Sequence, residues 1–274
     1  MSPPDHWGHH ARQWARIGPP LRPGPEDVAA VAAEVERWCA HHARPPRLLL
    51  LGVTPELAAH RWPAGTSLVA IDRSRPMIGA VFPAAAVPPA TVAAVGEWAA
   101  LPVAAGAVDV IIGDGALSTL RFSDQYRAVA AELARVLAPG GRLVLRLFAA
   151  PAEAEPLAAV AADLAAGAVD SFHSLKWRAA MAVQPAERNV GVVDIAAAVD
   201  ALAPDRDALA ARTGWSRDAI DTIDAYRGSA ARYSFPTLAE VEAALAPWFV
   251  DPAVRWPGYP LGRRCPTVAW TRGR

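Results

Sequence analysis

Short apolar runs that alternate with helical segments constrain the fold of this chain more than any other feature. Leu48–Leu51, Leu68–Ile71 and Val108–Ile112 have the length and the largely apolar content of buried strands. Apolar residues recur at helical spacing across Asp124–Leu137, and Arg142–Phe148 then returns to a strand pattern. Strands that alternate with helices in this way predict an α/β fold with a parallel, doubly wound sheet.

The segments that flank this core differ from it in composition. Residues 1–24 form an irregular arm rich in proline, tryptophan and histidine, and Pro25 begins a helix. Residues 151–236 are alanine-rich and helical without clear strands, and the capping box Thr237–Glu240 opens another helix. We therefore predict a single domain, residues 1–274, with four parts: an arm and helix (1–44), a core (45–150), a helical cap (151–236) and a closing helix with strands (237–274).

The charge balance and the cysteines limit the classes of partner and compartment. With 27 basic and 27 acidic side chains, the chain has no bulk electrostatic attraction to nucleic acid or to an anionic membrane. Cys39 and Cys265 lie far apart without metal or redox spacing, which indicates buried thiols in a reducing compartment, the cytoplasm. The uncharged stretch Pro76–Gly96 contains four prolines, so we expect a short helix and a loop there and no membrane span.

An acidic residue follows the second apolar run directly. The segment Asp72-Arg73-Ser74-Arg75-Pro76-Met77 begins where the strand Leu68–Ile71 ends. A carboxylate at the carboxyl end of such a strand lies at the crevice where open α/β sheets bind ligands, and it can accept hydrogen bonds from both hydroxyls of a ribose. The alternative is that Asp72 caps the following helix, a position that Asp favours.

Four segments, in order along the chain, carry a family resemblance. They are Leu48–Glu56, Asp72–Met77, Gly96-Glu97-Trp98 and Glu132–Leu143, the last of which contains Pro139-Gly140-Gly141. The series resembles the class I S-adenosylmethionine-dependent methyltransferases of the small-molecule type over roughly residues 45–150. The resemblance implies a Rossmann-like seven-stranded sheet with an N-terminal helical lid and a helical insertion after the fifth strand. It also implies methyl transfer from S-adenosyl-L-methionine to an O, N, S or C nucleophile of a small molecule.

The resemblance assigns roles to matched positions. Gly52 would let the backbone approach the methionine moiety, Asp72 would bind the ribose hydroxyls, and Met77 would pack under the adenine. Glu97 stands near the expected adenine amine, and Trp98 either packs beside the ring or serves the core. The expected cofactor-binding residues are Trp14, Gly52, Val53, Thr54, Asp72, Arg73, Met77, Gly96, Glu97, Trp98, Asp114 and Gly115.

The first motif departs from the pattern of the family. The family has an acid and three spaced glycines there, whereas this chain has Leu50 at the acid position and Thr54 and Glu56 at two glycine positions. Glu56 is a candidate to replace the missing acid. A second hypothesis follows, in which the chain is a non-catalytic binding or partner module with a weakened cofactor site.

The arm contains the candidates for a general base. His6 and His10 belong to a segment that would fold over the cofactor, with Trp7 and Trp14 closing the lid, and no catalytic residue is otherwise identified. The histidines lack the converging ligand pattern of a metal site, so no metal is expected.

Residues 207–227 resemble a DNA-binding helix-turn-helix. Asp218, Asp221 and Asp224 would face phosphates there, so a helical cap over the site fits better, with these acids on its solvated face. The expected partner is a small-molecule acceptor, with no nucleic acid and no membrane, and a homodimer is left open.

Overall fold

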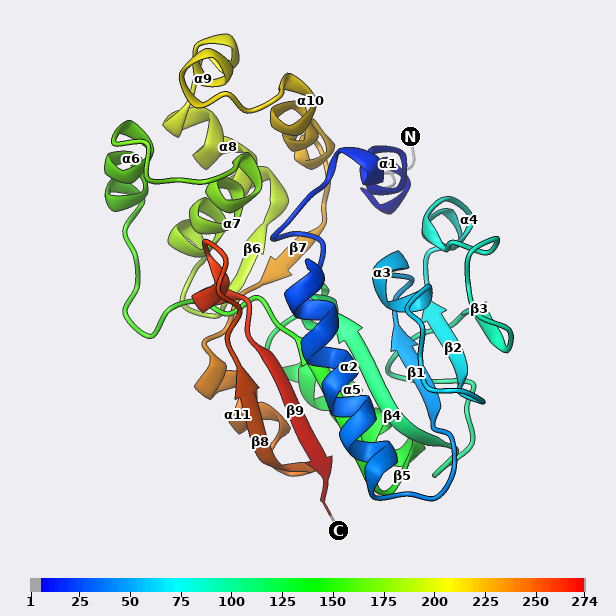
Figure 1. Cartoon of the computed structure of the whole chain (residues 1–274). Helices are drawn as coiled ribbons and strands as arrows, with labels where there is room; N and C mark the ends of the chain where they lie inside the picture. Colours follow the sequence, from blue (N-terminus) through cyan, green and yellow to red (C-terminus); the bar gives the residue numbers. More distant parts are fainter. Residues whose placement is uncertain (1–5, 274) are drawn as a thin grey trace.

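A seven-stranded sheet forms the centre of the molecule, and the computed structural model describes residues 6–273 of the chain (Figure 1). The strand order is β3-β2-β1-β4-β5-β9-β8. The first five strands run parallel, and β9 is antiparallel to β5 and β8. The prediction of a doubly wound, Rossmann-like seven-stranded sheet is therefore confirmed. The strands are β1 (Arg47–Leu51), β2 (Ser67–Asp72), β3 (Thr91–Val95), β4 (Val108–Asp114), β5 (Leu137–Arg146), β8 (Phe249–Arg255) and β9 (Thr267–Arg272).

Alternate residues of the central strands face opposite layers of helices. Leu48 and Leu50 of β1 belong to one apolar cluster, and Leu49 and Leu51 belong to the other. Because both faces are covered, the central strands are continuous apolar runs without polar alternation, as parallel strands require. The first cluster includes α2 (Pro25–Ala40), α3 (Pro55–Ala58) and α4 (Arg75–Val81), and the second includes α5 (Asp124–Val136) and α11 (Leu238–Leu245).

The edge strand β3 was not apparent from the sequence. The stretch 76–96, expected to be a short helix and a loop, contains most of α4 and also β3. As an edge strand it leaves Val92 and Val95 54% and 44% exposed, so it lacks the continuous burial that marks the inner strands. One boundary also differs from expectation, since β5 begins at Leu137 in place of Arg142.

The cap follows β5 and lies beyond the carboxyl ends of the parallel strands (Figure 1). It was expected to be helical without strands, which is wrong in one respect, because β6 (Asn189–Gly191) pairs antiparallel with β7 (Arg232–Ser234). These strands are three residues long, too short for a periodic pattern. The helical elements of the cap are α6 (Leu157–Ala165), α7 (Phe172–Val183), α8 (Val192–Leu202), α9 (Arg206–Thr213), α10 (Arg217–Ile220) and the 3-10 helix η3 (Asp221–Tyr226). Across residues 6–273 no helix is long and apolar enough to cross a membrane.

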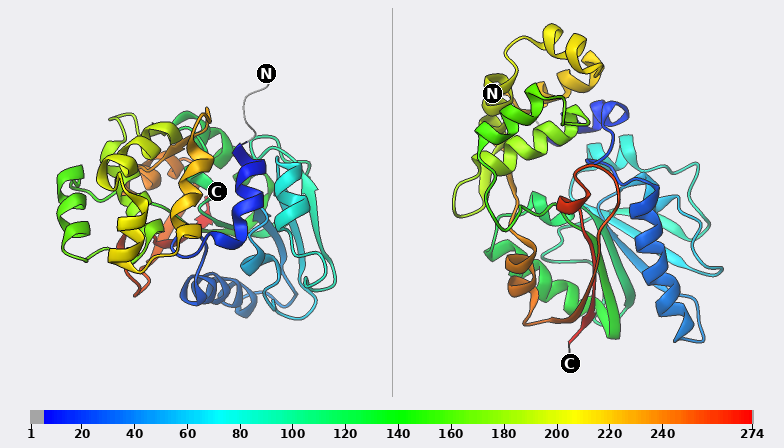
Figure 2. Two further views of the ribbon diagram at one scale, coloured as in Figure 1. Left: turned by 90° about the horizontal axis from the view of Figure 1, so that it is seen from above. Right: turned by 60° about the vertical axis from the view of Figure 1, so that its left-hand side comes forward.

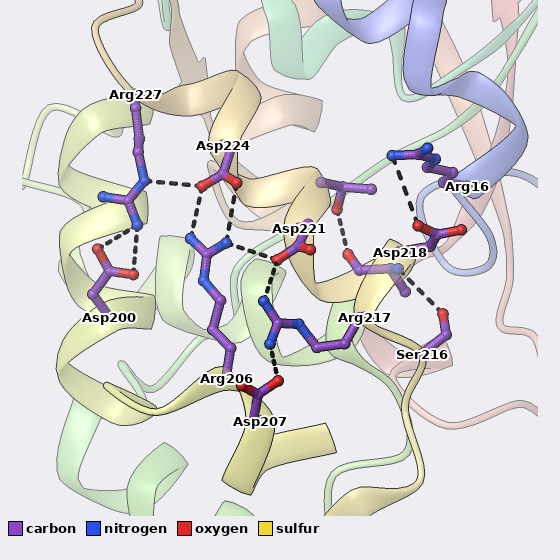
Figure 3. A network of polar contacts seen from close by, with 12 residues as sticks. Arg16, Asp200, Arg206, Asp207, Ser216, Arg217, Asp218, Asp221, Asp224 and Arg227 are labelled. Atoms are coloured by element: carbon purple, nitrogen blue, oxygen red, sulfur yellow. Dashed lines mark hydrogen bonds and ion pairs between the residues drawn. The ribbon is translucent and has the colours of Figure 1, made fainter. Parts of the chain in front are cut away.

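The acids of the helix-turn-helix-like segment are paired with arginines (Figure 3). The guanidinium of Arg206 forms ion pairs with the carboxylates of Asp221 and Asp224, each with an N–O distance of 2.7 Å. Asp218 lies 3.8 Å from Arg16 of the arm and is largely exposed. The second helix of this segment, α10, has only four residues before it becomes η3. The segment is therefore part of the cap, and its acids contact arginines of the cap and of the arm.

The arm crosses from the cap to α4 (Figure 2). Its described elements are α1 (His6–Gln13) and the 3-10 helix η1 (Trp14–Arg16), while residues 1–5 of the predicted arm lie outside the described residues. The carbonyl oxygen of Arg16 lies 3.2 Å from Nε2 of His173 in α7. Further on, the carbonyl of Pro20 accepts a hydrogen bond from Arg146 of β5 at 2.9 Å. The arm is thus bound to both the cap and the sheet.

A buried carboxylate paired with two half-exposed arginines holds the amino end of the sheet. Asp109 of β4 is fully buried, and its carboxylate accepts hydrogen bonds from Arg44 at 2.7 Å and from Arg47 at 2.9 Å. Burial raises the pKa of Asp109, but the hydrogen bonds from both arginines outweigh it and hold this pKa well below its ordinary value. A carboxylate with a lowered pKa stabilises the folded state above the unfolded pKa of about 3.9, and this contribution is lost as the pH falls below it.

We expect Asp109→Asn to lower the free energy of unfolding at pH 7 by about 1–3 kcal/mol, because charged hydrogen bonds are lost in a buried position. The difference from wild type should shrink as the pH falls below about 4. Urea unfolding at several pH values measures both effects, with Asp124→Asn, whose partner Arg121 is exposed, as the control. Equal stability of the Asp109 variant and the control variant at pH 7 would contradict the structural role.

Candidate active site

A cavity of about 240 Å³ lies at the carboxyl ends of the parallel strands and is bordered by the arm and the cap. The strand order reverses between β1 and β4, the point where open α/β sheets bind ligands. The residues that the sequence predicts to bind the cofactor line this cavity, while the role of each residue stays a prediction. The predicted residues that line it are Trp14, Gly52, Val53, Thr54, Asp72, Arg73, Met77, Gly96, Glu97, Trp98, Asp114 and Gly115.

Gly52 turns the chain out of β1 at the wall of the cavity. Its φ is +88°, a backbone conformation that strains any residue with a side chain. A Cβ at this position would point toward Asp72, 3.7 Å from its Oδ2. The single glycine therefore keeps the backbone of the β1 turn and the carboxylate of Asp72 open to the same space.

Asp72 does not cap the following helix. Ser74 is the capping residue of α4, because its Oγ accepts a hydrogen bond from the backbone N–H of Met77 at 3.3 Å. Asp72 Oδ1 accepts from the N–H of Ser74 at 2.7 Å. Burial raises the pKa of Asp72, and the bond from Ser74 opposes that rise. The carboxylate is thus fixed through one oxygen, and Oδ2 faces the side of Gly52.

Trp98 and Gly96 form the wall beyond the end of β3. The indole N–H of Trp98 donates to the carbonyl of Ile71 at 2.8 Å, which fixes the half-buried ring beside β2. A Cβ at Gly96 would lie 2.9 Å from Ile71 and 3.2 Å from Pro102, so only glycine fits this close approach. Glu97 lies between Gly96 and Trp98 in the chain and is exposed at the rim of the cavity. Trp98 therefore packs beside the sheet and also lines the cavity, while its contact with an adenine ring stays a prediction.

Asp114 is engaged by a buried arginine that the sequence did not reveal as part of the site. Arg146 is 1% exposed, and its Nε donates to Asp114 Oδ1 at 2.5 Å. A second carboxylate, Asp27 of α2, lies 3.7 Å from the same guanidinium. Burial raises the pKa of Asp114, and Arg146 opposes the rise. The only sequence signal was an arginine in a strand that otherwise reads as buried.

Glu56 is committed to the arm. Its Oε1 accepts from Arg22 Nε at 2.8 Å, and it does not line the cavity. The guanidinium of Arg22 also lies 5.1 Å from the ring centroid of Trp14, which does line the cavity. The candidate replacement for the missing acid of the first motif therefore binds the arm beside the cavity.

The arm and the cap meet at a tyrosine. The hydroxyl of Tyr233 lies 3.1 Å from His6 Nε2 and 3.3 Å from His10 Nε2. His10 lines the cavity, whereas His6 is buried behind it, with Nδ1 3.1 Å from Ser229 Oγ. Of the two candidate bases, His10 is the one placed to meet a ligand.

Burial lowers the pKa of His10 well below its usual range, and the charges of His6 and Lys176 lower it further. Lys176 is fully buried in α7, and within residues 6–273 its Nζ has no hydrogen-bond partner. It lies 4.9 Å from the ring centroid of Tyr226, and burial lowers its pKa to about 7. His10 is therefore an uncharged imidazole at neutral pH and can accept a proton.

Several aromatic residues of the wall were not predicted. Phe148, Trp177 and Tyr233 line the cavity and come from β5's end and from the cap. Their sequence context is an ordinary apolar or alanine-rich one, without a motif. Over the part of the chain described, no three His, Cys, Asp or Glu side chains are grouped so that they could hold a metal ion.

Comparison with known proteins places the core in one family. Residues 51–145, about a third of the chain, match the family model described as a methyltransferase domain. No curated protein matches the sequence.

Solved structures share the fold over most of the chain. A SAM-dependent methyltransferase from Methanosarcina mazei has a TM-score of 0.50 at 15% identity, covering 92% of this chain and 98% of that one. The CurJ carbon methyltransferase has a TM-score of 0.53 at 12% identity, covering 90% and 54%. A protein from Rhodobacter sphaeroides described as a putative Zn-dependent alcohol dehydrogenase has a TM-score of 0.56 at 13% identity, covering 97% and 98%. At these identities the likeness shows the fold alone.

The environment of His10 predicts a measurable titration. We expect its imidazole to titrate with a midpoint below 6.5, the value of an unperturbed histidine, when followed by NMR. Because the folded state then binds fewer protons than the unfolded state below that pH, the arm loses stability as the solution is acidified from pH 7. Hydrogen exchange of the α1 amides should accelerate accordingly, with the α5 amides as the internal reference. A His10 midpoint at or above 6.5 would contradict this assignment.

Proposed function

We propose that this chain, which contains a class I S-adenosylmethionine-dependent methyltransferase domain, transfers the methyl group of that cofactor to a nucleophile of a small molecule. The observation that carries the proposal is the convergence of Gly52, Asp72, Glu97 and Asp114 on one cavity from the ends of four neighbouring strands. When bound, S-adenosylmethionine supplies an electrophilic methyl group on a sulfonium. The acceptor is a small molecule, because residues of the arm and of the cap both line the cavity and leave a space of about 240 Å³.

The residues present fit this cofactor. The open space at Gly52, which a Cβ would enter, suits a backbone approach to the methionine moiety. Asp72, fixed through Oδ1, offers Oδ2 to the ribose hydroxyls. Buried Met77 and the fixed ring of Trp98 provide apolar walls for the adenine. A dinucleotide suits the site less well, since Gly52 is the only glycine in the turn from β1 to α3 to receive a pyrophosphate.

The remaining lining residues take supporting roles. Gly96 brings the chain close to β2, and Glu97 at the rim faces the expected adenine amine. Val53, Thr54, Arg73, Trp14 and Gly115 complete the cofactor wall.

Positioning supplies much of the catalysis, because aligning a nucleophile with the methyl group removes the entropy cost of encounter. His10 acts as the general base where the nucleophile carries a proton. His6 contacts the hydroxyl of Tyr233 and holds that side chain in place behind His10.

Calorimetry with S-adenosylmethionine and with its demethylated product tests the proposal, with NAD as the competing ligand. We expect binding of both adenosyl compounds and about 10- to 100-fold weaker binding to Asp72→Ala, since a charged hydrogen-bond acceptor contributes about 1.5–3 kcal/mol. Ser74→Ala is the matched control, because it removes the cap of α4 and should lower the Tm while retaining affinity. No heat with either compound at millimolar concentration would refute the cofactor site, and an unchanged affinity of folded Asp72→Ala would remove Asp72 from it.

The arm should act as a lid. Deleting residues 1–17 removes Trp7, His10, Trp14 and Ile17 from the cavity wall but leaves the bond between Pro20 and Arg146. We expect the truncated protein to fold with a near-normal circular dichroism spectrum and to lose turnover, because water then enters the transfer site. In the full chain, ligand should slow hydrogen exchange of the arm. Equal exchange with and without ligand would show that the arm is a fixed strap.

A further inference from the structure

The cavity has two chemically different halves. Its charged side chains are Asp72, Arg73 and Glu97, from the ends of β2 and β3, and Asp114 at the end of β4, whose carboxylate is bonded to Arg146. The other half, which we call the aromatic half, is built by the arm, the cap and the residue that follows β5 by two positions. Its members are Trp7, His10, Ile17, Phe148, Trp177 and Tyr233. With the cofactor over β1 to β3, the aromatic half is the place left for the acceptor.

The rings of the aromatic half are held by one another. Trp177 packs edge-on against Phe148, with ring centroids 5.4 Å apart, and edge-on against Tyr233 at the same distance. Trp177 is 3% exposed and Tyr233 is 4% exposed, so neither ring is free to turn away. A fixed wall of ring faces and edges favours a flat aromatic ligand over a flexible chain, because the interaction free energy of an aromatic pair exceeds what its buried area alone provides.

No counter-ion is available in the aromatic half for a charged acceptor. Arg146 lies 5.0 Å from the ring centroid of Phe148, but its guanidinium is bound to Asp114 and to the carbonyl of Pro20. Lys176 is fully buried and does not line the cavity. A carboxylate or phosphate on the acceptor would lose its water without gaining a hydrogen-bonded partner. An ammonium would be repelled by the sulfonium of the bound cofactor, which carries the same charge.

The polar groups of the aromatic half suit a hydroxyl. His10 is the only titratable side chain there besides Tyr233, and the two are in contact at 3.3 Å. Burial raises the pKa of Tyr233, so it stays a hydrogen-bond donor. The sulfonium of the bound cofactor, which opposes an ammonium, favours an oxygen that becomes negative during the reaction.

We propose that the acceptor is an uncharged, flat aromatic alcohol of the phenol type, bound in the aromatic half and deprotonated by His10. This inference rests on the proposed function for its chemistry. The proton of the hydroxyl passes to the imidazole of His10, the oxygen–methyl bond forms as the sulfur–methyl bond breaks, and the products are an aryl methyl ether and the neutral thioether of the cofactor. Buffer then removes the proton from His10.

Three matched probes test the acceptor class: 1-naphthol, 1-naphthoate and decahydro-1-naphthol. They compare a neutral aromatic alcohol with an anion of the same ring and with a saturated alcohol of similar size. With S-adenosylhomocysteine present, we expect 1-naphthol to bind about tenfold or more tightly than either of the others, measured by calorimetry. Equal or tighter binding of 1-naphthoate would overturn the uncharged acceptor. Equal binding of decahydro-1-naphthol would overturn the aromatic one.

Two wall variants and one control locate the binding. Trp177→Leu should weaken 1-naphthol about tenfold. Because Trp177 is a core residue whose loss can unfold the cap, Trp7→Leu in the half-buried arm provides the second variant. Trp256→Leu is the control, since Trp256 is 46% exposed and outside the cavity. Unchanged 1-naphthol affinity in folded Trp177→Leu or Trp7→Leu would place the probe elsewhere and overturn the proposal.

The failure of this inference and that of the proposed function can be told apart. With S-adenosylmethionine, wild type should form 1-methoxynaphthalene, detected by mass spectrometry, and His10→Gln should bind 1-naphthol while losing at least about tenfold in methyl transfer. Binding of 1-naphthol without binding of S-adenosylmethionine would contradict the proposed function and leave the acceptor class standing. Binding of S-adenosylmethionine with no affinity for 1-naphthol would contradict the acceptor class alone.

Discussion

The buried contact between Arg146 and Asp114 is the interaction on which the site depends. It joins the carboxyl ends of β4 and β5, and through Pro20 and Asp27 it also ties the arm and α2 to the sheet. A guanidinium that is 1% exposed is tolerated only because its donors are paired, so removing one partner would leave an uncompensated buried charge. The pair therefore fixes where the arm leaves the sheet and where the wall of the cavity begins.

The contact of Glu56 with the arm explains why the first motif has a glutamate at one of its glycine positions. In place of a glycine, the chain has Glu56 in the first turn of α3, and this side chain binds Arg22, whose guanidinium lies over Trp14. The position thus serves to hold the arm beside the cavity. Gly52 alone keeps the backbone open, which suffices for a ligand that has no phosphate to cradle. The departure from the family pattern is local, and Asp72, Met77 and Glu97 still line the cavity.

Charge is distributed unevenly over the molecule, and the distribution follows burial. Exposed acids of the cap, such as Asp218 and Asp224, are paired with arginines, where each surface pair contributes little to stability (Figure 3). Inside, burial lowers the pKa of Lys176 to about 7, and burial together with the charges of His6 and Lys176 lowers the pKa of His10. The pKa values of these two side chains are therefore set mainly by burial between the arm and the cap.

Local sequence patterns were sufficient for the parallel strands β1, β2, β4 and β5 and for the part of the cavity at the ends of β1 and β2. Gly52 directly follows the apolar run Leu48–Leu51, and Asp72 directly follows the second apolar run, so the local pattern placed both at the carboxyl edge of the sheet. The family resemblance added Trp98, and all three residues line the cavity. The remaining features of the sheet and of the cavity depend on contacts between segments that are distant in the sequence. β3 was missed because an edge strand carries no burial pattern, and Arg146 was not recognised as a partner of Asp114 because the pairing spans 32 positions. His10 meets Tyr233 across 223 positions, and no periodicity in a sequence encodes which distant segments fold against one another.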